Sequence, residues 1–211
     1  MNRLLIIGAG GHSRVILETA QAIGCYSDYA YLDDKYTKEI ESETINGIPI
    51  IGKISYLSSD FCKSNYNSAI VAIGDSAMRV SILKKLLKYY QVPFLIHPNA
   101  YVAASATLDN GTVVFAQAAV QSNAVVGEGC IINTCASIDH DVVLAEGVHI
   151  CPGAHLAGNV RIGKSTWVGI GSSIIQNINI GSNVYIGAGS VVLKDINSGS
   201  RVAGVPARAI S

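Results

Sequence analysis

The stretch VVGEGC IINTCA SIDHDV VLAEGV HICPGA HLAGNV, residues 125–160, repeats with a period of six. In each group of six the second residue is Val, Leu or Ile, and the sixth is small or β-branched. The same phase holds over sixteen consecutive groups, from Tyr101 to Ile196, without an insertion. An internal repeat of this kind predicts a solenoid, in which each repeat packs on its neighbours.

The period of six predicts a coil with three flat sides. One aliphatic side chain per group points inward, and the small residue before it fits the corner, so eighteen residues close one turn. Neither an α-helix nor a membrane span has this period. We therefore predict that residues 98–196 form an all-β, left-handed parallel β-helix, an exception to the right-handed crossover rule. Residues 197–211 leave the repeat as a C-terminal tail, in which Pro206 interrupts a regular strand.

Residues 1–97 follow a different pattern, in which strand-like and helix-like runs alternate. RLLII (3–7) leads into a glycine turn, and RVILETAQAIG (14–24) has helical periodicity and ends at Gly24. YAYLDD (29–34), SAIVAIG (68–74) and VPFLIHP (92–98) predict further strands, and RVSILKKLLKYY (79–90) predicts a second helix. This alternation predicts a small Rossmann-like α/β domain with a parallel sheet.

The composition excludes several classes of partner. Lys plus Arg and Asp plus Glu are equal, at 15 each, so there is no basic field for nucleic acid or an acidic membrane. No charged residue occurs between Lys164 and Lys194, but Asn, Ser and Gly interrupt this run, and it is not a membrane span. The N-terminal apolar run breaks into glycines where a signal peptide would continue. The five cysteines lack CxxC spacing, so we expect reduced thiols in a cytoplasmic protein.

The loop GAGGHS, residues 8–13, follows a strand and precedes a helix. Its backbone N–H groups and the helix dipole could bind a phosphate. A dinucleotide fingerprint would need glycine at position 13, where this chain has Ser13. Asp33 ends the second strand, where a ribose-binding acid would favour NAD, but nothing downstream indicates hydride chemistry. A tight structural turn is the other interpretation of the glycines.

His140 lies between two carboxylates in SIDHDV, residues 137–142. Because Ile138 is the inward residue of its group, His140 and Asp141 occupy a corner and project outward. The carboxylate can orient the imidazole and raise its basicity, as a general base requires. A solvated turn is the alternative interpretation. His155 faces outward before Leu156, and we interpret it as a surface or interface residue.

The chain resembles the bacterial hexapeptide-repeat sugar acetyltransferases in its repeats and in GAGGHS, IDHD, AGNVRIG and GVPAR. The most similar group is the nucleotide-sugar N-acetyltransferases that acetylate UDP-4-amino-4,6-dideoxy-N-acetylglucosamine in the bacillosamine pathway. The sialic acid O-acetyltransferases are a near branch. The resemblance covers essentially the whole chain and is more specific for the family than for the substrate. It implies a homotrimer with acetyl-CoA in the groove between adjacent β-helices, and no metal.

The resemblance also implies roles for particular residues. His140 would be the base that takes the proton from the sugar amine, and Asp141 would steady its imidazole, although relatives often have glutamate there. Gly158 would direct its backbone N–H at the thioester oxygen. The other residues expected to bind acetyl-CoA are Asn133, His149, Gly187, Ala188, Gly189 and Arg208. The nucleotide sugar would bind to Gly10, Gly11, His12, Asp33, Asp34, Gly74 and Asp75.

The function expected is therefore N-acetylation of a nucleotide-linked 4-amino-4,6-dideoxy sugar in surface glycan biosynthesis. O-acetylation of a sialic acid is an alternative within the same reaction class. A zinc carbonic anhydrase would need three converging histidines, and the spacings from His140 to His149 and His155 do not match that pattern. A non-catalytic nucleotide-binding subunit is the remaining alternative, and replacing His140 with Ala would distinguish it from an enzyme.

Overall fold

The computed structural model describes residues 2–37 and 44–210, and it divides into two compact units. Unit 1 comprises Met1–Leu95 and unit 2 comprises Ile96–Ser211. The division falls within the strand β6 (Leu95–Ile96), close to the boundary expected after residue 97. Each unit has its own hydrophobic core.

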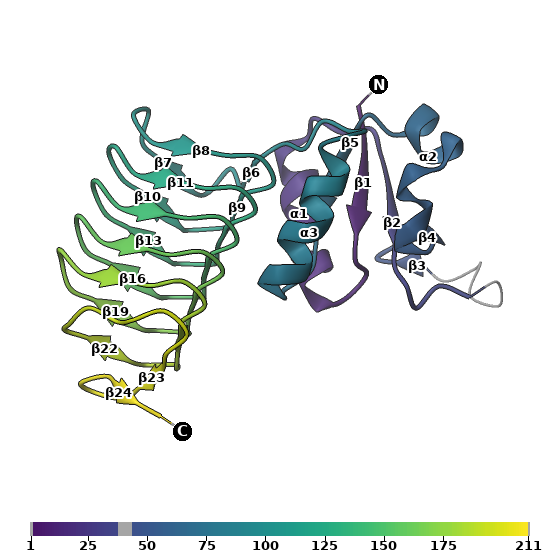
Figure 1. Cartoon of the computed structure of the whole chain (residues 1–211). Coiled ribbons are helices and arrows are strands. Elements are labelled where there is room, and N and C mark those ends of the chain that lie inside the picture. Colours follow the sequence, from purple (N-terminus) through teal and green to yellow (C-terminus); the bar gives the residue numbers. More distant parts are fainter. Residues whose placement is uncertain (1, 38–43, 211) are drawn as a thin grey trace. The chain divides into compact units, whose positions relative to one another are not determined.

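Unit 1 is a five-stranded sheet with helices (Figure 1), as its alternating sequence pattern predicts. The strand order is β3-β4-β2-β1-β5, and all neighbours are parallel except β3 and β4. Its strands are β1 (Arg3–Ile7), β2 (Asp28–Leu32), β3 (Thr44–Ile45), β4 (Ile48–Gly52) and β5 (Ser68–Val71). Its helices are α1 (Gly11–Ile23), the 3₁₀ helix η2 (Ile54–Ser58), α2 (Asp60–Asn65) and α3 (Ser76–Leu86).

The order of the strands brings three loops to one edge of this sheet. β1 lies between β2 and β5, so the residues that follow these three parallel strands leave the sheet at the same carboxyl edge. Ligands of open α/β sheets bind at such an edge. Gly24 ends α1 in the left-handed conformation, with φ 73°, as the sequence predicts. The segment from β3 to α2 has no counterpart among the predicted elements, because its short runs carry no clear period.

Unit 2 is a triangular coil, and Figure 1 shows its turns stacked one above another. Strands eighteen residues apart pair in parallel, for example Ile131 with His149 and Ser137 with His155. The three sides are an eight-stranded, a six-stranded and a five-stranded sheet. The inward residues of the repeat form the core from Val114 to Val192, and most are less than about 4% exposed.

The strands of unit 2 are short, and each belongs to one of the three sides. The six-stranded side holds β7 (Tyr101–Val102), β10 (Ala119–Val120), β13 (Ser137–Ile138), β16 (His155–Leu156), β19 (Ser173–Ile174) and β22 (Val191–Val192). The five-stranded side holds β8 (Thr107–Leu108), β11 (Val125–Val126), β14 (Val143–Leu144), β17 (Arg161–Ile162) and β20 (Asn179–Ile180). The eight-stranded side holds β6, β9 (Val113–Val114), β12 (Ile131–Ile132), β15 (His149–Ile150), β18 (Trp167–Val168), β21 (Tyr185–Ile186), β23 (Arg201–Ala203) and β24 (Arg208–Ala209).

The corners of the coil depend on the fifth residue of each group, which has positive φ from Gly111 to Gly189. Gly, Asn and Asp tolerate this conformation best, and they predominate at the position. The last residues differ from the expected tail, because β23 pairs in parallel with β21 and β24 returns antiparallel to it. The chain turns back at Gly204, with φ 101°, so these residues extend one side of the coil.

Candidate active site

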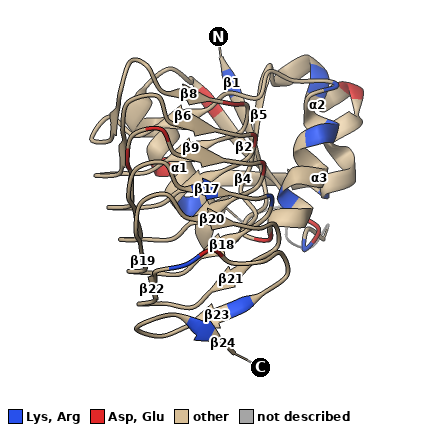
Figure 2. Ribbon diagram, turned by 60° about the vertical axis from the view of Figure 1, so that its left-hand side comes forward, with Lys and Arg blue, Asp and Glu red and all other residues tan. Residues whose placement is uncertain are grey.

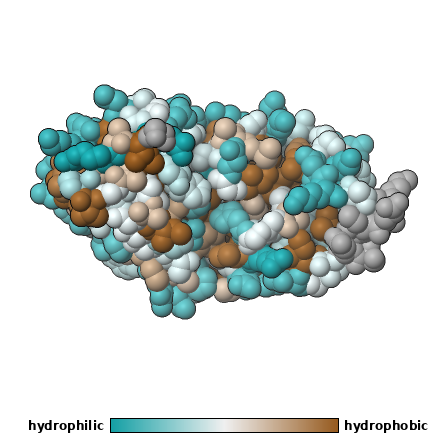
Figure 3. Space-filling model, turned by 90° about the horizontal axis from the view of Figure 1, so that it is seen from below, coloured by the Kyte–Doolittle hydropathy of each residue, from teal (hydrophilic) through white to brown (hydrophobic). Residues whose placement is uncertain are grey.

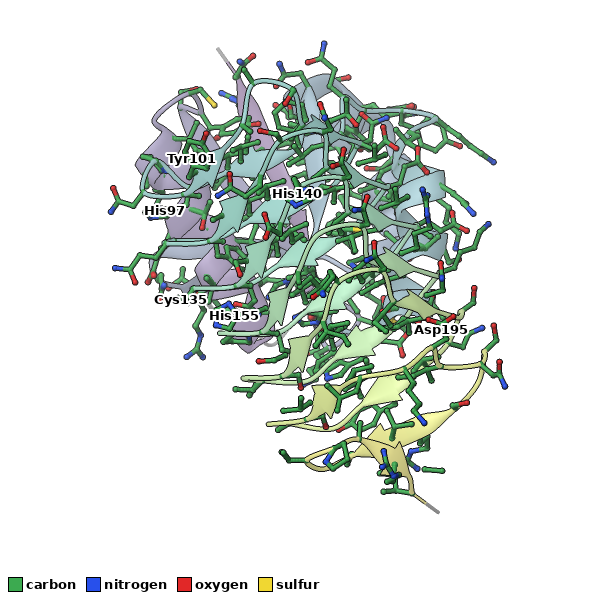
Figure 4. The ribbon with its side chains drawn as sticks, turned by 90° about the vertical axis from the view of Figure 1, so that its left-hand side faces the viewer. His97, Tyr101, Cys135, His140, His155 and Asp195 are labelled. Carbon is green, nitrogen blue, oxygen red and sulfur yellow. The ribbon has the colours of Figure 1, made fainter. Side chains whose placement is uncertain are left out.

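His140 and Asp141 lie at the corner between β13 and β14, where the six-stranded and five-stranded sides meet. The imidazole Nδ1 lies 2.8 Å from Oδ2 of Asp141. The two side chains are 55% and 46% exposed, so a second molecule can reach them. Figure 4 looks onto this side of unit 2 and labels His140. The hydrogen bond to Asp141 leaves Nε2 as the ring nitrogen that can face a substrate.

The carboxylate changes the basicity of His140. The hydrogen bond to Asp141, together with the negative charges of Asp139 and Asp141, raises the pKa of the imidazole against a smaller opposing effect of desolvation. Reciprocally, hydrogen bonds from His140 and Asn123 lower the pKa of Asp141. A carboxylate that stays ionised beside an imidazole is the arrangement that a histidine general base requires.

Asn123 was not predicted from the sequence, yet it holds the carboxylate from the preceding coil. Its amide nitrogen donates to Oδ1 of Asp141 at 3.3 Å. Asn123 and Asp141 are eighteen residues apart and occupy the same fifth position, with φ 59° and 60°. Because residues eighteen apart are neighbours in adjacent coils, the repeat alone could have predicted this contact.

Gly158 lies one coil after His140, at the same position of the repeat. A Cβ atom built on Gly158 would lie 2.5 Å from Cε1 and Nε2 of His140, so the imidazole rests directly on the glycine backbone. Any side chain here would displace the ring. The backbone N–H of Gly158 makes no hydrogen bond within the described residues, so it stays available as a donor.

Asn133 and His149 lie on a different part of the coil from His140. His149 occupies the outward position of β15 on the eight-stranded side, where its neighbours bury it to 6% exposure. Asn133 directly follows β12 on the same side. The Asn133 amide nitrogen lies 3.2 Å from Nε2 of His149, and the ring of Trp167 lies edge-on to His149 at 4.2 Å. The eight-stranded side is opposite the corner of His140 in a three-sided coil, so one chain does not bring these groups together.

The corner between β21 and β22 holds Gly187, Ala188 and Gly189. It joins the eight-stranded side to the six-stranded side, as does the corner after β12 that contains Asn133. A Cβ at Gly187 would lie 2.8 Å from Cβ of Ala203, so packing within the chain already requires this glycine. Gly189 has φ 66° and serves the corner conformation. The residues expected at the acetyl-CoA site therefore form two sets, one at the corner of His140 and one on the opposite side.

Arg208 lies on the eight-stranded side, paired with Ala203, whereas His155 lies on the six-stranded side. Arg208 is exposed in β24, and its guanidinium donates to the Ala207 carbonyl at 2.9 Å. Figure 2 shows Lys and Arg in blue at β23 and β24, on a β-helix ribbon that is otherwise mostly uncharged. His155, also labelled in Figure 4, extends from β16, and its Nδ1 lies 2.8 Å from the Ser137 hydroxyl.

Unit 1 contains a pocket of about 410 Å³ at the carboxyl edge of its sheet. Six of the seven residues expected to bind a nucleotide sugar line it. They are Gly10, Gly11, His12, Asp33, Asp34 and Gly74. The lining also includes residues that sequence reasoning did not identify: Gly8, Lys35, Ile54, Ala72, Ile73 and Met78.

Three of the pocket glycines are not required by the fold. A Cβ at Gly10, Gly11 or Gly74 would meet nothing within 4 Å, and none of the three has positive φ. Gly8 is different, because it has φ 102° and a Cβ there would lie 2.9 Å from Ile73. Gly10 is the N-cap of α1, so the N-terminus of a thirteen-residue helix adjoins this space.

The aspartates of the pocket also bind the backbone. Asp33 accepts from the Ala9 N–H at 2.7 Å and from the Lys35 N–H at 2.8 Å, which fixes the glycine loop to the end of β2. Asp34 accepts from the Ile54 N–H at 3.0 Å. Asp75 is the N-cap of α3 and accepts from the Met78 N–H at 2.7 Å. Asp75 is absent from the residues that line the pocket, where Met78 takes part instead.

A buried charge lies behind this pocket. Arg79 of α3 is 1% exposed, and its guanidinium binds the carbonyl groups of Ile73 and Gly74. Burial and the charge of Arg79 lower the pKa of His12 to about 4. His12 is therefore neutral at pH 7. Nothing in the sequence pattern distinguishes Arg79 from the exposed lysines of the same helix.

No group of three or more His, Cys, Asp and Glu side chains among the described residues could hold a metal ion. Across residues 2–37 and 44–210, no helix has the length and apolar character that crossing a membrane requires. On the face shown in Figure 3, apolar atoms form separate groups among hydrophilic ones.

Comparison with known proteins identifies both units. Residues 3–86 match the PglD N-terminal domain, and residues 159–194 match the bacterial transferase hexapeptide repeats. The acetyltransferase domain of PglB from Neisseria gonorrhoeae is 40% identical, with a TM-score of 0.94 and full coverage of both chains. The chain belongs to the hexapeptide-repeat sugar acetyltransferase family. Membership confirms the predicted fold, a Rossmann-like domain followed by a left-handed parallel β-helix.

Other members of the hexapeptide-repeat acetyltransferase family have more specific names. Perosamine N-acetyltransferase from Caulobacter crescentus, solved with CoA and GDP-perosamine, is 31% identical with a TM-score of 0.94, and 100% of this chain and 98% of that chain are covered. UDP-N-acetylbacillosamine N-acetyltransferase from Bacillus subtilis is 37% identical over 119 residues. That alignment covers 55% of this chain and about half, 52%, of the Bacillus protein. The PglB domain has also been solved with acetyl coenzyme A.

Proposed function

We propose that this chain transfers the acetyl group of acetyl-CoA to the amine of a nucleotide-linked 4-amino-4,6-dideoxy sugar. The observation that carries the proposal is the His140–Asp141 pair on an outward corner, at 2.8 Å, with the imidazole resting on Gly158. An exposed histidine whose Nδ1 binds a carboxylate is a general base that can serve a second molecule.

The proposed mechanism follows from these positions. The neutral amine attacks the thioester carbonyl, and Nε2 of His140 takes the proton that the nitrogen loses. Asp141 holds Nδ1 and stabilises the imidazolium. The oxyanion of the tetrahedral intermediate accepts from the backbone N–H of Gly158, and its collapse breaks the carbon–sulfur bond. The imidazolium then returns the proton to the departing CoA thiolate.

A complete site requires two copies of the chain. His140, Asp141 and Gly158 lie at one corner, whereas Asn133, His149 and the corner of Gly187 to Gly189 lie along the opposite side. We infer that the corner of one copy faces the eight-stranded side of the next, with acetyl-CoA in the groove between them. In a closed homotrimer, this heterologous contact would occur three times. Arg208 then supplies positive charge for the CoA phosphates.

The nucleotide sugar occupies the pocket of unit 1. Gly10, Gly11 and Gly74 leave open space that the fold does not need, and the start of α1 suits a diphosphate. His12 faces the sugar as a neutral hydrogen-bonding group, and Asp33 and Asp34 lie on the nucleoside side. Relatives named for a GDP sugar and a UDP sugar support this class of substrate, and we propose the UDP form here. Such a reaction belongs to the cytoplasm and to surface glycan biosynthesis.

The direct experiment follows thiol release from acetyl-CoA with a colour reagent. The substrate is UDP-4-amino-4,6-dideoxy-N-acetylglucosamine in one series, GDP-perosamine in a second and sialic acid in a third. We expect rapid release with the UDP sugar, and a fall of about a hundredfold or more in His140→Ala. Release only with sialic acid would assign the chain to O-acetylation. A His140→Ala protein that keeps its turnover would refute the proposed base.

A further inference from the structure

Arg79 is the largest fully buried side chain among the described residues, at 1% exposure. Charged side chains are almost never buried this completely, because removal from water costs free energy that hydrogen bonds must offset. Its position in α3, directly behind the unit 1 pocket, therefore calls for a function.

The guanidinium of Arg79 binds the loop that leads into its own helix. Nη1 donates to the carbonyl oxygens of Ile73 and Gly74 at 3.0 and 2.7 Å, and Nη2 donates to the Ser76 hydroxyl at 3.2 Å. Ile73 and Gly74 line the pocket. The planar fork of arginine suits several acceptors at once, so one side chain fixes the whole turn between β5 and α3.

The same turn contacts the glycine loop on the other wall of the pocket. Gly8 lies so close to Ile73 and Ala72 that a Cβ would approach them to 2.9 and 3.0 Å. The Ala72 N–H donates to the Ile7 carbonyl at 2.7 Å. A shift of the β5–α3 turn would therefore also move the loop that we propose binds the diphosphate.

Arg79 also acts on His12, which lies on that opposite wall. Burial, reinforced by the charge of Arg79, lowers the pKa of His12 to about 4. The imidazole is therefore neutral and adds no positive charge to this wall. The positive field of Arg79 still reaches the pocket, where a diphosphate would benefit from it.

We infer that Arg79 is a positioning residue for the nucleotide sugar, fixing the wall formed by Ile73 and Gly74 against the glycine loop. This inference rests on the proposed function, because it assigns the unit 1 pocket to that substrate. It predicts an effect on nucleotide-sugar binding that is separate from acetyl-CoA binding and from the chemical step.

The test compares Arg79→Met, Arg79→Lys and Lys85→Met, the last as a matched loss of an exposed charge from the same helix. For each protein, KM is measured for the nucleotide sugar and for acetyl-CoA, and the binding of UDP and of GDP is titrated by calorimetry. In Arg79→Met we expect the sugar KM and the UDP Kd to rise about tenfold, because several charge-assisted hydrogen bonds are lost. In Arg79→Met the KM for acetyl-CoA stays within about twofold of the wild-type value. In Arg79→Lys we expect the sugar KM and the UDP Kd to rise about threefold. Lys85→Met behaves as wild type.

Far-UV circular dichroism and thermal unfolding show whether each variant is folded. A folded Arg79→Met protein with unchanged sugar KM and UDP Kd would overturn the inference and leave the proposed function intact. If Arg79→Met does not fold, the test rests on Arg79→Lys. A wild-type sugar KM and UDP Kd in that variant would equally overturn the inference. If wild-type protein binds neither UDP nor GDP, the substrate assignment fails and the inference falls with it.

Discussion

The two units position their candidate functional groups in different ways. In unit 2 every position recurs after eighteen residues, so the neighbours of His140 are fixed by the repeat: Gly158 lies on one side, and Asn123 reaches Asp141 from the other. In unit 1 the pocket is assembled from four segments distant in sequence, and a buried side chain, Arg79, holds one of them. A periodic scaffold supports a site by backbone register, whereas an irregular one needs individual side chains.

Gly158→Ala would have the largest effect, because it fills the space that the repeat leaves for the His140 ring. The new Cβ would lie 2.5 Å from the His140 ring and would push the imidazole from its place. We expect kcat to fall about a hundredfold, while the unfolding temperature changes little. Steady-state kinetics and calorimetry measure both.

The double variant His140→Ala/Gly158→Ala provides the control. If Gly158 acts through the ring, adding the alanine to His140→Ala changes nothing further. An additional large loss in that background would show that the alanine disturbs more than the position of the ring.

Asp141→Asn would have an intermediate effect. We expect the plateau value of kcat/KM in the pH profile to fall about tenfold. The anionic carboxylate raises the pKa of His140, so the base becomes active only as pH rises through a value above the ordinary 6.5. With asparagine, that pKa falls, and the acidic limb of the profile moves to lower pH while the plateau drops. An acidic limb that stays in place would contradict the role given to Asp141.

Asn123→Gly would show the smallest effect, because it removes only the amide that holds Asp141 at 3.3 Å. Glycine tolerates the φ of 59°, so the corner keeps its conformation. We expect kcat to fall about two- to threefold. Asn183→Gly, at the same repeat position with φ 57°, is the matched control at another corner. Equal losses in both variants would assign the effect to the coil rather than to the carboxylate.

The sequence predicts the parts of the molecule that depend on periodicity. The β-helix, its inward residues and the outward corner of His140 follow from the period of six, and the eighteen-residue register could also have paired Asn123 with Asp141. The division of the expected acetyl-CoA residues between two sides of the coil needed the three-dimensional course of the chain. Arg79 could not be predicted, because an arginine in an amphipathic helix is ordinarily exposed and only tertiary packing buried this one.

The most direct test of the account is complementation between two inactive variants. The central claim is that the His140 corner of one copy and the eight-stranded side of the next copy, which carries Asn133 and His149, form one site. His140→Ala and His149→Ala, each of which we expect to have little activity alone, are mixed in equal amounts, denatured and refolded together, and assayed for thiol release. Random assembly would restore about a quarter of the sites, because that fraction joins an intact His140 to an intact His149. Activity no greater than the sum of the two variants would contradict a site shared between copies.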